Sequence, residues 1–412
     1  MQRFHIHKAC WLLLLPLLLS SCLRLTERKY DSAKVAFNIS YNPLFDGIIY
    51  PSLILGVSGY NGGIPDDAEL FTISLTSPAA NAVLRVEIDS TALSYVTILQ
   101  EEMPKRGETY TFHPLIKWKY DALYAMRRQG IADFTATCYI NDERVAVRNL
   151  RLNYRSANEC PISLRGPDGS LHSFRWLFAG YVNEDHPYID SILTKIVDQR
   201  VVSGFVGYQR GAKQVSEQVF AFWYYALERG IAYSSISCTS NPSTMANVQR
   251  IRFFDEVYNS RQANCIDACV FFASLMRKIG LKPVIFVEPC HAYLGYYTDK
   301  KRKDIRLLET TITSWVSFPE MDSHLNDKGK LDDKYYLTIQ KYLSEADQQR
   351  YAQGKLPYEK MKMAIARTLF DKASEYNQDN HVANATYFAD STNAAYQQLD
   401  IENLRRLVQP IN

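Results

Sequence analysis

Three residues in the second half of the chain have the types, the order and the surroundings of a thiol acyl-transfer site. Cys265 begins a run with helical periodicity, His291 begins a later run typical of a strand, and Glu309 follows a third such run. This chemistry needs a cysteine nucleophile, a histidine that takes and returns its proton, and a group that orients the histidine. The sequence therefore predicts a triad of Cys265, His291 and Glu309.

The residues around Cys265 predict that its thiol lies in the first turn of a helix. Asn264 is a favourable N-cap residue, and Asp267 stands three positions later, as in a capping box. Apolar residues then recur at helical spacing until Gly280 ends the helix; they are Ala268, Phe271, Phe272, Leu275, Met276 and Ile279. The first turn of a helix favours an anion, hence a thiolate, although Asp267 opposes it if its carboxylate lies close.

Two further strands are expected to bring the other two members of the triad together. Residues 284–287 (VIFV) and 291–297 (HAYLGYY) are typical of strands, and a basic loop over 298–306 leads to the third run. Adjacent antiparallel strands would place Glu309 beside His291, where the carboxylate would fix one tautomer and stabilise the imidazolium.

An acyl-transfer site also needs hydrogen-bond donors for an oxyanion. The backbone N–H of Cys265 is the first candidate, because it opens the predicted helix. Asn259 and Gln262 are the nearest upstream side-chain amides, and either could supply the second donor. The interpretation of both as ordinary turn residues is the stronger one.

Each member of the triad alone has a simpler interpretation. A single cysteine at a helix start is inert more often than reactive, and a histidine before an aromatic strand is commonly structural. A lone glutamate is commonly a surface carboxylate. The functional interpretation depends on the joint order of Cys265, His291 and Glu309, each in a fitting local context.

Four segments resemble the motifs of transglutaminase-like domains. In that family a Gly-x-Cys-x-Asp/Glu segment begins a helix that ends in Arg-x-x-Gly-Ile-Pro-Ala-Arg, and His-Ala-Trp and Leu-Asp-Pro-Thr segments follow. The matching segments here are 264–268 (NCIDA), 276–284 (MRKIGLKPV), 291–293 (HAY) and 308–311 (LETT), with Trp315 after the last. The resemblance implies Cys265 as nucleophile, His291 as base and Glu309 as orienting acid. It also implies a fold similar to papain-like cysteine proteases over about 150 residues, an ordinary domain size.

Three positions depart from the family pattern. Ala263 stands where the family has Gly, Tyr293 where it has Trp, and Glu309 where it has Asp, which adds one methylene to the reach. Two functions therefore stay open. The first is a cysteine peptidase or amidase that forms a thioester, with hydrolysis favoured over transfer to an amine, since transfer requires that water be excluded. The second is an inactive surface or periplasmic binding protein with the same fold.

The composition is that of an ordinary globular protein. The chain has 412 residues, 47% of them hydrophobic and 22% charged, and a formal net charge of +3. It has no basic stripe with interleaved aromatic residues, so we expect no nucleic-acid partner. We also expect no metal and no cofactor. The partners that the sequence suggests are a peptide or protein substrate, with cell-wall peptide among the options, and a membrane.

The N-terminus has the pattern of a bacterial lipoprotein leader. Arg3 and Lys8 form a positive region, and residues 11–19 (WLLLLPLLL) form an apolar core that is too short to span a bilayer permanently. The Leu-Ser-Ser-Cys segment that ends at Cys22 resembles a lipobox, which implies lipid on Cys22 and removal of residues 1–21. We therefore expect a membrane-anchored protein outside the cytoplasm, facing the periplasm or the cell surface.

The pairing of the eight cysteines is left open by the sequence. Cys10 would be lost with the leader, and five remain besides Cys22 and Cys265; they are Cys138, Cys160, Cys238, Cys269 and Cys290. A bridge between Cys269 and Cys290 could fix the helix to the histidine strand, and simple buried thiols are the alternative.

The chain as a whole predicts an α+β protein. The expected parts are a leader (1–21), a tether (22–33), an immunoglobulin-like β-sandwich (34–156), a transglutaminase-like domain (170–320) and a helical C-terminal extension (321–412). Strands are expected over 34–41, 48–57, 69–75, 83–88, 95–99, 133–140 and 145–154, the last two as a hairpin around Asn141-Asp142-Glu143. Helices are expected over 119–128, 187–197, 215–229, 334–350, 358–376 and 401–407, a linker over 159–173 and a loop over 377–381.

Overall fold

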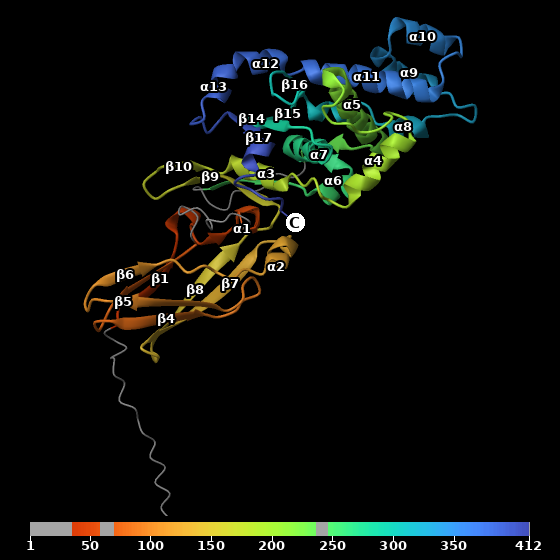
Figure 1. Ribbon diagram of the computed structural model, residues 1–412. Helices are drawn as coiled ribbons and strands as arrows, with labels where there is room; N and C mark the ends of the chain where they lie inside the picture. Colours follow the sequence, from red (N-terminus) through yellow and green to blue (C-terminus); the bar gives the residue numbers. More distant parts are fainter. Residues whose placement is uncertain (1–34, 58–69, 236–245, 412) are drawn as a thin grey trace, which may run out of the picture.

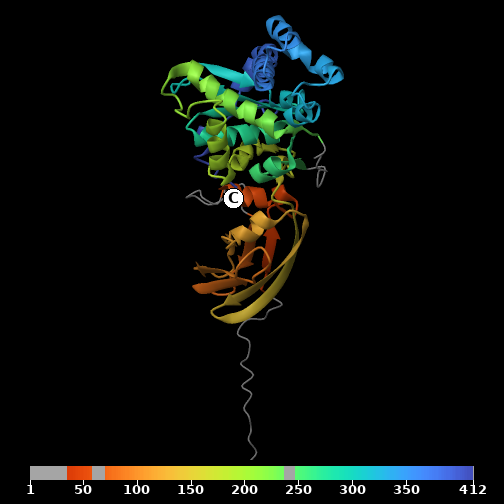
Figure 2. The same ribbon diagram turned by 90° about the vertical axis from the view of Figure 1, so that its right-hand side faces the viewer.

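The computed structural model describes residues 35–57, 70–235 and 246–411, and the architecture is α+β with several separate sheets. The predicted leader, the tether with Cys22, and Cys238 lie outside these residues. Within them, no helix is both long and apolar enough to cross a lipid bilayer. Figures 1 and 2 show one part built mainly of strands, and a second part that combines strands and helices.

The N-terminal part contains two sheets whose buried faces meet. One sheet has the order β1 (Phe37–Tyr41), β3 (Phe71–Thr76), β6 (Thr109–Phe112). The other has the order β2 (Ile48–Ile49), β8 (Glu143–Tyr154), β7 (Gly130–Ile140), β4 (Ala82–Ile88), β5 (Thr97–Met103). Phe71 of β3 packs edge-on against Phe134 of β7, with ring centroids 5.0 Å apart. The two sheets therefore share one apolar core.

The predicted hairpin around Asn141 is confirmed. Ile140 pairs with Glu143, which leaves Asn141 and Asp142 as a two-residue turn with φ of 48° and 67°. Positive φ at both central positions suits the twist of antiparallel strands, and Asn and Asp tolerate it. Four alternate residues of β7 are buried and share one face of the sheet; they are Phe134, Ala136, Cys138 and Ile140.

Two predictions for the first half of the chain are wrong. Residues 48–57 are not one strand, because Pro51 cannot donate to a ladder and instead begins helix α1 (Pro51–Val57). Residues 159–173 are not a linker but the strands β9 (Glu159–Arg165) and β10 (Leu171–Ser173), in a sheet with β12 (Ala246–Arg250). A shift in the β9–β12 register beside Pro161 accommodates the proline.

The second part is built on a four-stranded antiparallel sheet with helix α7 (Cys265–Lys278) packed against it. The strand order is β16 (Ile305–Leu308), β15 (His291–Tyr297), β14 (Pro283–Glu288), β17 (Gln397–Asp400). The other helices here are α3 (Phe178–Tyr181), α4 (Tyr188–Asp198), α5 (Gly211–Arg229), α6 (Phe254–Ser260) and α8 (Phe318–Ser323). The aromatic residues of α5 belong to the core, and Trp223 stacks on Phe272 of α7.

The C-terminal extension is only partly as predicted. Its helices are α9 (Asp333–Ile339), α10 (Glu345–Ala352), α11 (Tyr358–Glu375), α12 (Gln378–Ala383), α13 (Ala385–Ala389) and α14 (Ile401–Leu404). The single helix expected over 334–350 is interrupted where Ser344 caps α10, and the loop expected over 377–381 is mostly α12. Strand β17 was not predicted.

The two parts meet at α1 and α3 (Figure 1). Ser52 Oγ of α1 donates to the carbonyl oxygen of Glu159, 2.7 Å away. The chain end returns to the same junction: Gln409 N–H donates to the Gly56 carbonyl and Ile411 N–H to the Gly180 carbonyl, at 2.8 and 2.7 Å. The C-terminal residues therefore connect both parts of the molecule.

Candidate functional site

Cys265 is the first residue of α7, and the predicted capping box holds this end of the helix. The Asn264 side chain accepts from the backbone N–H of Asp267 at 2.9 Å, and the Asp267 carboxylate accepts from the backbone N–H of Asn264 at 3.0 Å. Two backbone donors at the helix start are thereby satisfied. The thiol of Cys265 is half-buried and forms no disulfide.

The carboxylate of Asp267 is paired with Arg252. Asp267 is fully buried, and it accepts from the Arg252 guanidinium at 2.7 Å and from the Arg252 backbone N–H at 2.8 Å. Burial raises the pKa of Asp267, and the hydrogen bonds from Asn264 and Arg252 offset part of that rise. The negative charge that could oppose a thiolate at Cys265 therefore has its own counter-charge.

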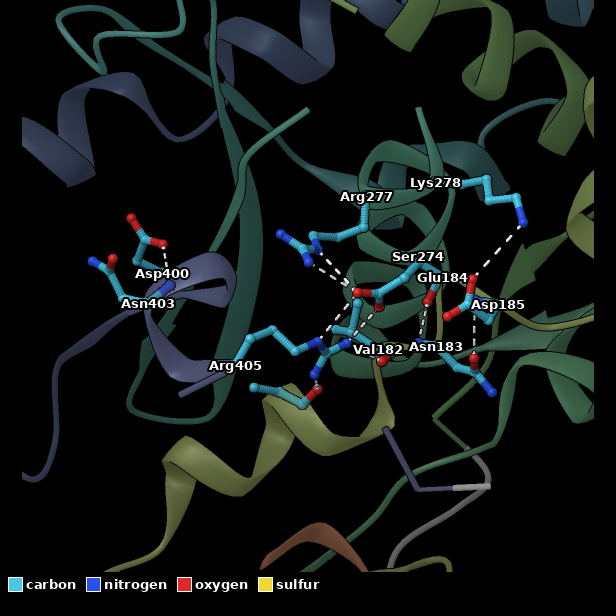
Figure 3. A network of polar contacts seen from close by, with 11 residues as sticks. Val182, Asn183, Glu184, Asp185, Ser274, Arg277, Lys278, Asp400, Asn403 and Arg405 are labelled. Atoms are coloured by element: carbon cyan, nitrogen blue, oxygen red, sulfur yellow. Dashed lines mark hydrogen bonds and ion pairs between the residues drawn. The ribbon is translucent and has the colours of Figure 1, made fainter. Parts of the chain in front are cut away.

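The other end of α7 is fixed by the polar cluster in Figure 3. Glu184 accepts from Arg277 of α7 at 2.9 Å and from Arg405, which follows α14, at 2.6 Å. Ser274 Oγ of α7 also accepts from the backbone N–H of Asn183 at 2.9 Å. Burial raises the pKa of Glu184, but the hydrogen bond and charge of Arg405 outweigh it, and the pKa lies below its usual value. The cluster fixes α7 relative to the chain end.

The strands place His291 and Glu309 on one face. His291 begins β15 opposite Glu288 of β14, and Leu294 pairs with Leu308 of β16. Continuing this pairing by one residue sets Glu309 opposite Tyr293, diagonal to His291. Diagonal neighbours on one face are about 7–8 Å apart, a distance that long side chains can bridge. The extra methylene of Glu309 suits this separation.

His291 and Glu309 are hydrogen bonded, as the sequence predicts. His291 Nε2 lies 2.8 Å from Glu309 Oε2. An ionised carboxylate only accepts, so Nε2 carries the proton and Nδ1 is left to face the thiol. The other oxygen, Oε1, accepts from Thr311 N at 3.0 Å and Thr311 Oγ1 at 2.6 Å. Burial raises the pKa of Glu309, but His291 and Thr311 outweigh it and lower the pKa below its usual value.

The imidazole of His291 connects the thiol to the carboxylate. Its interaction with Cys265 is the largest of the effects that raise the pKa of His291 to about 10, and the hydrogen bond with Glu309 is the second. Burial acts in the opposite direction and is outweighed. At neutral pH the ring of His291 therefore carries a proton.

The structure also places the other residues that the sequence singled out, namely the two amides and the two cysteines near the site. Asn259 lies near the end of α6 and Gln262 in β13 (Gln262–Ala263), and both are exposed. Cys269 is buried, with its sulfur 3.8 Å from Thr310 Oγ1, whereas Cys290 is exposed in the turn between β14 and β15. Both cysteines are free, so the suggested bridge between them is absent.

Two residues at the site were missed by the sequence analysis. Asn377 is buried, and its Nδ2 donates to Glu309 Oε2 at 2.5 Å. His381 Nδ1 lies 3.0 Å from the hydroxyl of Tyr293. Both come from the segment that was expected to be a loop. No local pattern could have revealed them, because each partner lies 68 or 88 positions away in the sequence.

Comparisons with known proteins add no identification. No protein-family model matches the chain, and no curated protein has a matching sequence. Among the residues that the structure describes, no three His, Cys, Asp or Glu side chains are grouped so that they could hold a metal ion.

Proposed function

We propose that this chain is a cysteine-dependent hydrolase of the transglutaminase-like kind, which cleaves peptide or carboxamide bonds through a thioester on Cys265. One observation carries the proposal: the imidazole of His291 is hydrogen bonded to the buried carboxylate of Glu309, and its interaction with Cys265 is the largest cause of its raised pKa. A nucleophile, a base and an orienting acid in this relation form the arrangement that thiol acyl transfer needs.

In the acylation step, the Cys265 thiolate attacks the carbonyl carbon of the substrate. The thiol proton resides on His291 Nδ1, while the Glu309 carboxylate accepts a hydrogen bond from Nε2–H of the same ring. Charge develops on the carbonyl oxygen, and the backbone N–H of Cys265 is suited to receive it, since a first-turn N–H has no acceptor within its own helix. His291 then protonates the leaving amine, the C–N bond breaks, and a thioester remains.

In the deacylation step, His291 acts as a base toward water. It removes a proton from the water that attacks the thioester, and the thiolate leaves as the product acid forms. The Asn259 or Gln262 amide is the proposed second donor to the oxyanion, and Gln262 lies nearer to Cys265 in the sequence. We favour water over an amine as acceptor, because transfer to an amine requires that water be kept from the thioester.

The fold supports the same proposal. Helix α7 carries the nucleophile at its first residue and packs on the antiparallel strands that carry the base, as expected for a papain-like arrangement. The two facing sheets of the N-terminal part support an immunoglobulin-like sandwich in a spacer or binding role. With lipid on Cys22, the substrate would be a peptide or protein outside the cytoplasm, cell-wall peptide included.

Cleavage of a peptide library by the purified protein tests the proposal. We expect hydrolysis that is abolished in Cys265→Ala and His291→Ala. Cys290→Ala, which removes an exposed thiol from the adjacent turn, is the matched control and should retain activity. Binding of peptides without cleavage, equal in all four proteins, would instead identify a non-catalytic binding protein.

A further inference from the structure

We infer that Asn377 is a positioning residue of this site: it holds the Glu309 carboxylate ionised and correctly turned toward His291. The inference rests on the proposed function and adds to it a residue outside the segments that resemble the transglutaminase-like family. Asn377 follows α11, in the C-terminal extension, 68 positions after Glu309. The extension would then be part of the catalytic site.

The hydrogen bonds of Glu309 leave no acceptor position unused. Oε1 accepts from the backbone and the hydroxyl of Thr311, and Oε2 accepts from His291 and from Asn377. An ionised carboxylate offers about four acceptor sites, so the four donors saturate it. Glu309 is fully buried, and Asn377 is 5% exposed, so solvent cannot replace a lost donor without a rearrangement.

This arrangement favours the ionised carboxylate. The Asn377 amide N–H and the Thr311 backbone N–H can only donate, so protonation of the oxygen that each contacts would reduce the acceptor capacity available to them, at a site closed to water. The shared oxygen is the important one, because Asn377 and His291 donate to the same atom, Oε2. Removal of the Asn377 amide would leave Oε2 with one donor, raise the pKa of Glu309, and weaken its hold on the imidazolium of His291.

The surrounding segment supports Asn377 in this position. The carbonyl of Ala373, in the last turn of α11, accepts from the backbone N–H of Glu309 at 2.8 Å. One helical turn after Asn377, the Asn380 amide donates to the Glu288 carboxylate at 2.9 Å, and His381 bonds Tyr293. Residues 373–381 therefore contact Glu309 and both strands of the hairpin that presents His291.

The pH dependence of alkylation at Cys265 distinguishes a positioning role from a structural one. The intact protein is treated with iodoacetamide across a pH series, and each cysteine is quantified by mass spectrometry. Cys290 reports an exposed thiol, and the buried Cys138 reports unfolding, because it is labelled only if the fold opens. Asn377→Ala and Asn377→Leu both remove the donor, the second with the same number of side-chain heavy atoms and the same branching, and Asn384→Ala is the matched control.

We expect the pH midpoint of Cys265 labelling to rise in both Asn377 variants while Cys138 stays unlabelled. The rate of Cys265 labelling at about pH 6 should fall roughly tenfold in these variants, which corresponds to the loss of one charge-assisted hydrogen bond. Asn384→Ala should label at the same rate as the wild type. An unchanged midpoint would overturn the inference, and so would labelling of Cys138 in both variants, which would assign Asn377 a structural role. If Cys265 of the wild type is no more reactive than Cys290, the proposed function itself fails.

Discussion

His291 Nε2 and Glu309 Oε2 lie 2.8 Å apart, and this contact joins the nucleophile to the C-terminal extension. On one side the imidazole interacts with Cys265, which raises its pKa, and on the other the Glu309 carboxylate accepts a hydrogen bond from Asn377. Cys265 and His291 begin α7 and β15, Glu309 follows β16, and Asn377 follows α11. A substitution of any of the other three residues should therefore change the reactivity of the Cys265 sulfur.

The titration of His291 is the first prediction. Its pKa of about 10 arises first from Cys265 and then from Glu309, so Cys265→Ser should lower the pKa toward the usual 6.5. NMR titration of the ring, assigned by comparison with His291→Gln, measures both values. A wild-type ring that titrates near 6.5 would contradict the geometry described for the site.

The same shift predicts a dependence of stability on pH. A pKa that is higher in the folded than in the unfolded state stabilises the fold when the group is protonated. The contribution of His291 should be fully present below pH 6.5 and be lost as pH rises through about 10. Urea unfolding across this range should show a loss of stability in the wild type that is smaller in His291→Gln.

Arg252→Ala should destabilise the start of α7. It leaves the fully buried Asp267 carboxylate without its counter-charge, which costs about 3 kcal/mol. The loss should shrink at acid pH, because protonation of Asp267 removes the uncompensated charge, and burial already raises the pKa of Asp267. Urea unfolding at neutral and acid pH measures this, with Arg250→Ala as the control. A loss that is equal at both pH values would mean that Asp267 is not the cause.

Arg405→Ala should loosen the chain end from α3 and α7. Its guanidinium donates to the carbonyls of Ala179 and Val182 and to the carboxylate of Glu184. Loss of these partners should cost roughly 2–4 kcal/mol in the free energy of unfolding. Arg406→Ala, which removes the exposed neighbouring side chain, should change stability little. Equal unfolding midpoints for the two variants would show that the cluster in Figure 3 contributes no stability.

The sequence predicted those elements whose signals are local. Asn264 and Asp267 are three residues apart and satisfy each other, so the start of α7 is encoded within one turn. The hairpin of β7 and β8 follows from alternating burial and from two residues that tolerate positive φ. His291 and Glu309 were placed together because the strands that carry them are adjacent in sequence and in the sheet.

The elements that were missed depend on partners distant in sequence. Residues 397–400 form a strand only because β14 offers a free edge to them. The segment around Asn377 is polar and lacks an apolar stripe, so it resembles a loop, yet Asn377 is buried against Glu309. Residues 159–173 contain Pro and Gly and were taken as a linker, whereas β12 pairs with them across more than 80 positions. Tertiary contacts decide these cases, and local propensity does not.

The alkylation rate of Cys265 in the folded protein tests the central claim most directly. If the sulfur is paired with the imidazolium of His291, iodoacetamide should label Cys265 at about pH 6 at least tenfold faster than the exposed Cys290, and His291→Ala or unfolding in urea should remove the difference. Equal rates at Cys265 and Cys290 in the folded wild type, unchanged in His291→Ala, would contradict the account.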